Sequence, residues 1–308
     1  MRWRKPVAAR PEVGMTAPLV HPEMPHVAVA CACALGEGPV WDHRTGTLLW
    51  VDIKAPAVWR HRPESGETSR LDVTEAIGFV ALTPDPEVVI AGFRSGLVRL
   101  DLRTGATDAL AAPEPDKPGN RINDGHVSPG GHVYFGTMDT REASRSGCFW
   151  RWDGSNLKAF GPECIVANGP ALSADGRTLY TVDSVDRCVF AHDLEGHDPR
   201  PPRLFVRFDE GWGHPDGFAC DAQEHVWVCH WGGSRITRFR PDGTIERVLP
   251  VPTAQVTKCA FGGDDLSTLY ITTAARGHDP HIDPMAGHLF RVQAGVRGVL
   301  ANIARSAP

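Results

Sequence analysis

The sequence predicts an all-β protein, and more specifically a six-bladed β-propeller. Three observations support this: many turn-forming residues, short runs of β-branched and aromatic residues, and a repeat with a spacing of 39 to 47 residues. The chain of 308 residues contains 32 glycines and 26 prolines, and it has almost no long stretch with helical periodicity. Apolar runs such as LLWVDI, VYFGTM and HVWVCHW are bounded by turn residues, as strands are.

Six segments share one layout, in which a short apolar strand, a tight turn and a second hydrophobic strand follow one another. A period of about 40 to 50 residues with some four strands per unit is typical of propeller blades. The segments span 37–53, 78–93, 123–138, 168–184, 216–231 and 258–274. Their second strands align from Leu49, Val88, Val133, Leu179, Val226 and Leu269. A β-sandwich with accidental regularity is the alternative interpretation of this pattern.

Further strand-like pieces follow these pairs, for example 187–194 with 203–208, and 234–240 with 244–250. The apolar run 26–33 precedes the first segment, and we expect it to complete the last blade and so close the ring. Prolines and charges interrupt the first residues of the chain. We therefore expect a flexible N-terminal tail over residues 1–24 and a propeller domain over residues 25–308.

Composition argues against several classes of partner. The formal net charge is −5, and Lys and Arg cluster only at the N-terminus, which argues against a nucleic-acid partner. No stretch of 18 apolar residues exists, so we expect no membrane span. The eight cysteines are scattered, which favours buried reduced thiols in a cytoplasmic protein over disulfides. We expect a monomer or a weak homodimer.

The residues that open the first strand of each segment are mostly polar. In a propeller these strands line the central channel, so equivalent positions converge on the axis at one face. Buried carboxylates and amides are costly without a partner, and an all-oxygen set suits a hard divalent cation. The alternative is that each residue only satisfies local backbone groups. The six positions are Glu37, Gly78, Asn123, Asn168, Asp216 and Lys258.

Two Pro-Asp-Gly triplets, which usually mark tight turns, occupy different places in this repeat. Asp242 lies between two outer strands of the fifth unit, where a hairpin turn is expected. Asp216 opens the first strand of the same unit, which already has its own turn at 221–224. We therefore predict that Asp242 forms a turn at the rim and that Asp216 points into the channel.

Several of these segments resemble the SMP-30/gluconolactonase family, which includes regucalcin. The resemblance rests on LGEGPVW, RINDGHVSPGGHVYFGTM, NGPALSADGRTLYTVD, PDGFACDAQEHVWVCHWGG and VTKCAFGGDDLSTLYITTA, in this order. It covers residues 35 to 292 and is nearest to bacterial aldonolactonases such as xylonolactonases and arabinolactonases. It implies a six-bladed propeller with one catalytic divalent metal in the channel.

By position, the resemblance implies Glu37, Asn168 and Asp216 as metal ligands, and Arg121 and Asn123 as substrate contacts. Where regucalcin-like members carry an acidic pair after GTM, this chain has DTREAS. The acidic substrate contact is thus displaced to Asp139 or Glu142, or absent, and we predict Glu142. The metal is Ca²⁺, Mn²⁺, Fe²⁺, Mg²⁺ or Zn²⁺.

The implied reaction is hydrolysis of a small-molecule sugar aldonolactone of the gluconolactone, xylonolactone or arabinolactone type. A cation would polarise the carbonyl and lower the pKa of a bound water, and Asp216 is the candidate catalytic residue that orients or deprotonates this water. Arg121 would steady the developing oxyanion, and Asn123 would bind sugar hydroxyls. No GxSxG nucleophile motif occurs.

Other residues keep two interpretations. Asp183 either hydrogen-bonds a ligand such as Asn168 or forms a turn at the end of its strand. Lys258 either offers charge to the substrate or pairs with a carboxylate. Gly78 has no side chain, and we expect that it leaves room for substrate.

Three rival functions also stand at this point. One is a broad esterase or organophosphate hydrolase on the same metal, one is a non-enzymatic calcium-binding regulator, and one is a protein-interaction platform. A fold alone decides none of them.

Overall fold

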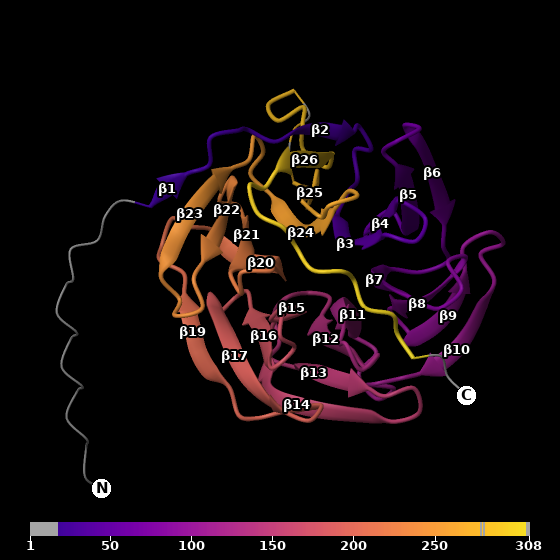
Figure 1. Ribbon diagram of the computed structural model, residues 1–308. Helices are drawn as coiled ribbons and strands as arrows, with labels where there is room; N and C mark the ends of the chain where they lie inside the picture. The colour runs from indigo at the N-terminus through magenta and orange to yellow at the C-terminus, as the bar shows by residue number, and fades with distance from the viewer. Residues whose placement is uncertain (1–17, 278, 280, 306–308) are drawn as a thin grey trace, which may run out of the picture.

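The structure, a computed structural model, describes residues 18–277, 279 and 281–305. These residues form six sheets set around a central axis, as Figure 1 shows, and the elements of the described part are strands without a helix. The predicted six-bladed β-propeller is therefore confirmed.

Blades 1 to 3 each contain four strands in sequence order from the axis outward. Blade 1 consists of β3 (Gly36–Asp42), β4 (Thr47–Asp52), β5 (Ala57–Arg62) and β6 (Glu67–Asp72). Blade 2 consists of β7 (Ile77–Leu82), β8 (Val88–Phe93), β9 (Leu97–Asp101) and β10 (Thr107–Ala111). Blade 3 consists of β11 (Asn120–Val127), β12 (Val133–Asp139), β13 (Gly147–Trp152) and β14 (Leu157–Cys164).

Blades 4 to 6 follow the same plan with additional or borrowed strands. Blade 4 consists of β15 (Ala167–Leu172), β16 (Thr178–Asp183), β17 (Cys188–Glu195) and β19 (Arg203–Arg207), and β18 (Asp198–Pro199) pairs with the end of β17. Blade 5 consists of β20 (His214–Cys220), β21 (Val226–Trp231), β22 (Arg235–Phe239) and β23 (Ile245–Pro250). Blade 6 consists of β24 (Val256–Gly262), β25 (Thr268–Thr273) and β26 (Leu289–Gln293).

The ring is closed by a strand from the other end of the chain. β2 (His26–Val29) pairs antiparallel with β26 and becomes the outer strand of blade 6, with His26 opposite Arg291. This confirms the expectation that the run at 26–33 completes the last blade. The inner strands contact one another in chain order around the axis, and β24 contacts β3. Blades 3 and 6 therefore lie opposite each other.

The predicted tail over residues 1–24 is described only in its last part. Residues 1–17 lie outside the described residues, so the prediction stays a prediction there. β1 (Leu19–Val20) pairs in parallel with β23, and the His21 amide donates to the Val248 carbonyl at 2.8 Å. This part of the predicted tail is a fifth strand of blade 5.

Every inner strand carries a break in its pairing register near the position that the sequence singles out. On β3 the break lies between Glu37 and Val40, and on β20 it lies between Pro215 and Phe218. The other four inner strands have equivalent breaks. A β-bulge bends the strand and redirects a side chain. The bulge in each inner strand therefore turns these residues toward the axis.

The hydrophobic core lies between neighbouring blades. The second strands of blades 1 to 3, β4, β8 and β12, are buried along their whole length because a blade packs on each face. One cluster joins blades 1 and 2, and another joins blades 5 and 6 around Trp227 and Phe290. Strands covered on both faces read as continuous apolar runs, which is why these segments stand out in the sequence.

The C-terminal segment 297–305 crosses the centre of the ring, as Figure 1 shows. Gly298 donates its amide to Leu266 O at 2.9 Å, and Ala304 donates its amide to Leu82 O at 2.8 Å. Asn302 Nδ2 donates to the Val127 carbonyl at 2.8 Å. The segment thus ties blade 6 to blades 2 and 3 across one face.

Two further expectations concern membrane-spanning segments and the cysteine thiols. In the described part of the chain, no helix has the length and apolarity needed to cross a membrane. All eight cysteines are free, six of them buried and two half-buried.

We predict opposite effects for two aspartates of blade 5. The Asp221 carboxylate is fully buried and accepts hydrogen bonds from Trp227 Nε1 and Arg238 Nε, each at 2.8 Å. Asp221→Ala leaves the buried guanidinium without this anion, so we expect the free energy of unfolding to fall by about 3 to 5 kcal/mol in chemical denaturation. Asp242 is exposed, and its carboxylate accepts hydrogen bonds from Thr244 of its own hairpin. Asp242→Ala is therefore the control and costs less than about 1 kcal/mol.

Candidate functional site

Four of the six equivalent positions of the repeat line one cavity at one end of the channel, namely Glu37, Asn123, Asn168 and Asp216, whereas Lys258 lines the cavity at the other end. Glu37, Asn123, Asn168, Asp216 and Lys258 lie on the inner strands of five blades, and each is at most 6% exposed. The sixth position, Gly78, packs against the neighbouring backbone, and a Cβ there would lie 2.3 Å from Asn123 O. Gly78 is thus required by close packing between blades, and the expectation that it leaves room for substrate is wrong.

A cavity of about 410 Å³ opens at this end of the channel. It brings together every residue that the sequence predicts for metal or substrate binding. These residues are Glu37, Arg121, Asn123, Glu142, Asn168 and Asp216. Their functional roles remain predictions, although all six residues line the same cavity.

A chain of hydrogen bonds connects blades 3, 4 and 5 along the cavity floor. Arg121 Nη1 donates to Asn123 Oδ1 at 2.7 Å, and Asn123 Nδ2 donates to Asn168 Oδ1 at 2.8 Å. Asn168 Nδ2 then donates to Ser184 Oγ at 2.9 Å, and this hydroxyl donates to Pro215 O at 2.7 Å. The network sets the orientation of both amides, and it leaves one lone pair of Asn168 Oδ1 for a further partner.

Two carboxylates in the cavity are buried without an ion-pair partner among the described residues. Burial, and next the Asp124 charge, raise the pKa of Glu37 to about 8, while the charges of Lys258 and Arg121 act in the opposite sense. Burial also raises the pKa of Asp216 well above its ordinary value, with the Glu37 charge as the next cause. The ionised forms of both groups therefore lack the compensation that water would give.

Lys258 neutralises a different carboxylate. Its Nζ donates to Asp124 Oδ1 at 2.5 Å, and both side chains are buried. The alternative that Lys258 pairs with a carboxylate is the one that the structure shows. Its stem fills the space beside Gly217, where a Cβ would lie 2.6 Å from Lys258 Cβ. Two cations, Lys258 and Arg121, are thus set against three acidic residues on the axis: Glu37, Asp124 and Asp216. Arg121 forms no ion pair with any of the three among the described residues.

The residues present fit a divalent cation. In the described ranges no three His, Cys, Asp or Glu side chains gather as a metal-binding group, because the predicted set completes its coordination with an amide. Two buried carboxylates and the Asn168 amide oxygen supply hard oxygen ligands, and water can occupy further positions. A cation of charge +2 would balance Glu37 and Asp216 directly.

The acidic residues after GTM divide into a turn former and a cavity residue. The Asp139 carboxylate accepts backbone amides of its own loop, including Arg141 and Ser144, and these bonds lower its pKa. Glu142 lines the cavity and has a left-handed backbone with φ of 57°. Of the two alternatives, Glu142 is the one that can reach a ligand in this cavity.

Asp183 also proves to be a turn former. Its carboxylate accepts the Ile165 and Val185 amides and pairs with Arg145 at 3.0 Å. The neighbouring Ser184 is the residue that holds Asn168. Sequence reasoning missed Ser184, because a serine at a strand end carries no distinguishing signal.

Other cavity residues were also absent from the predicted site. They include His214, Trp231, Gln255 and Arg276. His214 Nδ1 hydrogen-bonds Ser184 O at 2.9 Å, and its position two residues before Asp216 was the available clue. Arg276 comes from the long segment between β25 and β26, whose path the repeat does not predict.

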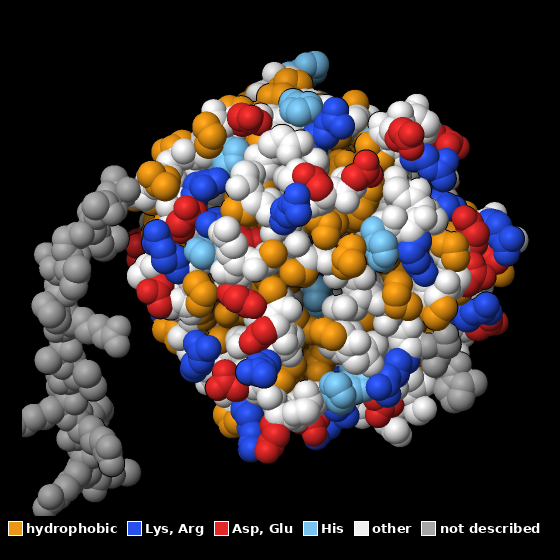
Figure 2. Space-filling model, in the orientation of Figure 1, with side chains coloured by type: hydrophobic (Ala, Val, Ile, Leu, Met, Phe, Trp, Pro, Cys, Tyr) orange, Lys and Arg blue, Asp and Glu red, His pale blue; other side chains and the backbone are white. Residues whose placement is uncertain are grey.

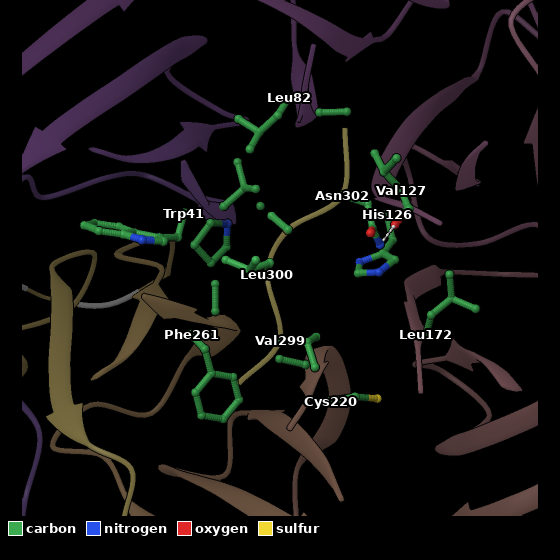
Figure 3. Close-up of a pocket in the computed structure, with 18 of the residues that line it drawn as sticks. Trp41, Leu82, His126, Val127, Leu172, Cys220, Phe261, Val299, Leu300 and Asn302 are labelled. Atoms are coloured by element: carbon green, nitrogen blue, oxygen red, sulfur yellow. Dashed lines mark hydrogen bonds between the residues drawn. The ribbon is translucent and has the colours of Figure 1, made fainter. Parts of the chain in front are cut away.

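The opposite end of the channel is lined mostly by apolar residues, together with Lys258 and His126. Figure 3 shows the cavity there, of about 220 Å³, with Val299, Leu300 and Asn302 beside Trp41 and Phe261. Hydrophobic side chains also gather around the centre of this face in Figure 2. His126 projects into the cavity, and burial lowers its pKa to about 3, so the imidazole is neutral. The two ends of the channel therefore differ in chemistry.

Comparisons with known proteins agree with this arrangement. The family described as "SMP-30/Gluconolactonase/LRE-like region" matches residues 35–275. An L-arabinolactonase of Azospirillum brasilense is 35% identical over 86% of this chain and 90% of its own length. A 6-deoxy-6-sulfogluconolactonase of Pseudomonas putida is 33% identical over 86% of this chain and 92% of its own. A crystal structure of regucalcin from Agrobacterium tumefaciens, named a calcium-binding protein, has a TM-score of 0.89 at 27% identity and covers 94% of this chain and 100% of its own.

We predict that Glu37 destabilises the metal-free protein at neutral and alkaline pH. Its folded pKa is raised from 4.5 to about 8, so the stability of the folded state is full below the ordinary pKa and falls as pH rises through the folded one. Relative to Glu37→Gln, the wild type should lose about 2 to 5 kcal/mol between pH 4.5 and pH 8. Denaturation in EDTA at a series of pH values measures this difference. A difference that does not vary with pH would contradict it.

Proposed function

Because the chain belongs to the SMP-30/gluconolactonase/LRE-like family, we propose that it is a metal-dependent lactonase. It hydrolyses a sugar aldonolactone of the gluconolactone, xylonolactone or arabinolactone type to the aldonic acid. The observation that carries the proposal is the pair of buried, uncompensated carboxylates, Glu37 and Asp216, in one cavity with Arg121 and two amides. Relatives that match over most of this chain are named lactonases, which supports the reaction class.

Glu37, Asn168 and Asp216 would hold the divalent cation. When bound, such a cation supplies a Lewis acid for the lactone carbonyl and lowers the pKa of a water in the site. The regucalcin neighbour is named a calcium-binding protein, which supports a metal of this class. Ca²⁺, Mn²⁺, Fe²⁺, Mg²⁺ and Zn²⁺ are the candidates.

Arg121 is placed to bind the reacting ester. Its side chain is only 6% exposed, and its Nε is buried with no hydrogen-bond partner among the described residues. Burial lowers its pKa only to about 10, so it keeps its charge at neutral pH. A buried guanidinium with a spare donor would hydrogen-bond the carbonyl oxygen and stabilise the oxyanion that develops there. Asn123 and Glu142 would bind the sugar hydroxyls.

Asp216 acts as the base in this proposal. Its carboxylate takes a proton from the attacking water as the water oxygen bonds to the lactone carbonyl carbon. The bond from this carbon to the ring oxygen then breaks, and the ring oxygen takes the proton that Asp216 received from the water, so the open-chain acid forms and the Asp216 carboxylate is restored. The acid loses its proton at neutral pH, so turnover acidifies the solution.

No serine nucleophile takes part in this proposal. The Ser184 hydroxyl lies in the cavity, but its hydrogen is donated to Pro215 O and its oxygen accepts from Asn168. His214 contacts the Ser184 backbone carbonyl and not the hydroxyl. Ser184 therefore has no base to activate it and serves to position Asn168.

We further expect a cytoplasmic monomer or weak homodimer.

A second candidate function is calcium binding without catalysis, which the name of the regucalcin neighbour favours. A regulator of this kind would bind the ion in the same cavity and leave lactone hydrolysis at its spontaneous rate. A broad esterase or organophosphate hydrolase would instead turn over a phosphotriester as well as a lactone. The same assay separates all three.

We predict that Asp216→Asn and Asp216→Ala lower metal-dependent lactone hydrolysis by at least about 10² fold, because a positioned base contributes this much. Acidification is followed over a panel of aldonolactones, with metal-stripped protein reconstituted ion by ion. Circular dichroism and thermal unfolding establish that the variants keep the propeller.

Asp242→Ala is the matched control, since it removes a carboxylate from the other Pro-Asp-Gly triplet at an exposed hairpin. It should hydrolyse lactones at the wild-type rate. Wild-type turnover by Asp216→Ala would overturn the assignment of the base. Absence of metal-dependent turnover by the wild type on every lactone would overturn the proposed reaction.

A further inference from the structure

Two cationic residues lie near the mouth of the candidate site: Arg276 lines the cavity, and Lys54 directly follows Ile53, which also lines it. Lys54 follows the end of β4 in blade 1, and Arg276 follows the end of β25 in the neighbouring blade 6. Both are exposed, whereas Glu37 and Asp216 lie deep in the same cavity. A ligand whose reacting end reached the carboxylates would therefore have its other end near these cations.

The backbone holds both residues against one short segment, residues 33–35. The Arg276 amide donates to Ala34 O at 3.0 Å, while the Asp52 carboxylate accepts the amides of Ala34 at 2.8 Å and Lys54 at 3.1 Å. Asp52 also caps Leu35 at 3.1 Å. The positions of Lys54 and Arg276 are thus set by buried hydrogen bonds, although their side chains are exposed.

The charged groups of both side chains are available for a ligand. Among the described residues, Lys54 makes no side-chain hydrogen bond or ion pair. Arg276 has one ion pair, in which its Nη1 lies 3.6 Å from Glu142 Oε1. This separation exceeds a hydrogen-bond length, so the Arg276 guanidinium donates no hydrogen bond to another described residue. Glu142 belongs to blade 3, which lies opposite blade 6, so the pair spans the mouth.

Like charges accumulate around this mouth. The pKa of Lys54 is lowered by burial, and then by the charges of Arg121 and Arg276, while Glu142 acts in the opposite sense. Arg276 likewise lowers the pKa of Arg121. Three cations thus repel one another around the cavity. Glu37 is the main opposing charge for Arg121 deep in the site, and Glu142 is the opposing charge for Lys54 at the mouth. A bound anion would relieve that repulsion.

We propose that Lys54 and Arg276 form a subsite for an anionic substituent of the substrate, at the end of the lactone remote from its carbonyl. The substituent is a carboxylate, sulfonate or phosphate, whose oxygens match the planar fork of an arginine. This inference rests on the proposed lactonase function and adds a substrate class to it. The lactones preferred by this protein are then acidic sugars and not neutral ones.

The test compares two lactones that differ in one group, D-glucono-1,5-lactone and its 6-phosphate. The metal-reconstituted wild type should have the lower KM for the phosphate. Arg276→Gln and Lys54→Gln should each raise that KM about five- to tenfold, because each removes a charge-assisted contact at a half-exposed position. The KM for the neutral lactone should change less than about twofold in both variants.

Arg103→Gln is the matched control, because it removes the same charge from an exposed position on the outer part of blade 2. It should leave both KM values unchanged. Raising the ionic strength should weaken binding of the phosphate and not of the neutral lactone. A variant effect of equal size on both lactones would show that the cations hold the product carboxylate or the ring, and would overturn the subsite.

A binding measurement separates this inference from the reaction itself. Gluconate and 6-phosphogluconate are not hydrolysed and differ only in the neutral or phosphorylated substituent. Calorimetry with these two ligands therefore measures what the phosphate adds to binding, without turnover. If neither lactone is hydrolysed, tighter binding of 6-phosphogluconate that is lost in Arg276→Gln still supports the subsite while the lactonase proposal fails. If the neutral lactone is hydrolysed and the phosphate confers no advantage in KM or affinity, the lactonase stands and the subsite is overturned.

Discussion

The burial of two unpaired carboxylates on the propeller axis is the constraint on which the rest of the site depends. Glu37 and Asp216 come from blades 1 and 5, and each costs free energy in its ionised form because water is excluded. The only buried ammonium beside them, within the described residues, pairs with Asp124. The fold therefore places negative charge at its centre, and a bound cation would lower the free-energy cost of that charge. The amide network around Asn168 leaves one lone pair of its side-chain oxygen available to such a cation.

The two ends of the channel provide different chemical environments. At one end the inner strands begin, their bulges direct polar side chains to the axis, and the longer loops of blades 3 and 6 meet over the cavity. At the other end the C-terminal segment crosses a mostly apolar cavity, and His126 is neutral there. Polar ligands would thus enter from the loop face, where the cations Lys54 and Arg276 stand.

Much of the site could be predicted because it follows the repeat. The register that aligned six second strands also placed Glu37, Asn123, Asn168 and Asp216 at one level of the channel, and it separated Asp216 from Asp242. Predictions failed where packing between blades decides a position. Gly78 is needed by the Asn123 backbone, and Ser184 holds Asn168 across a turn. Such contacts join residues far apart in the sequence and leave no periodic trace.

The sequence by itself determined the number of blades, the strand that closes the ring and the residues that face the axis, because strand alternation and turn chemistry are local and recur in every unit. Tertiary structure decided which charges are paired and which are not. Lys258 pairs with Asp124 from another blade, and Glu142 meets Arg276 across the mouth. These pairings depend on the geometry of the closed ring, since only closure brings opposite blades within reach, and for Lys258 and Asp124 it also removes the water that would screen their charges.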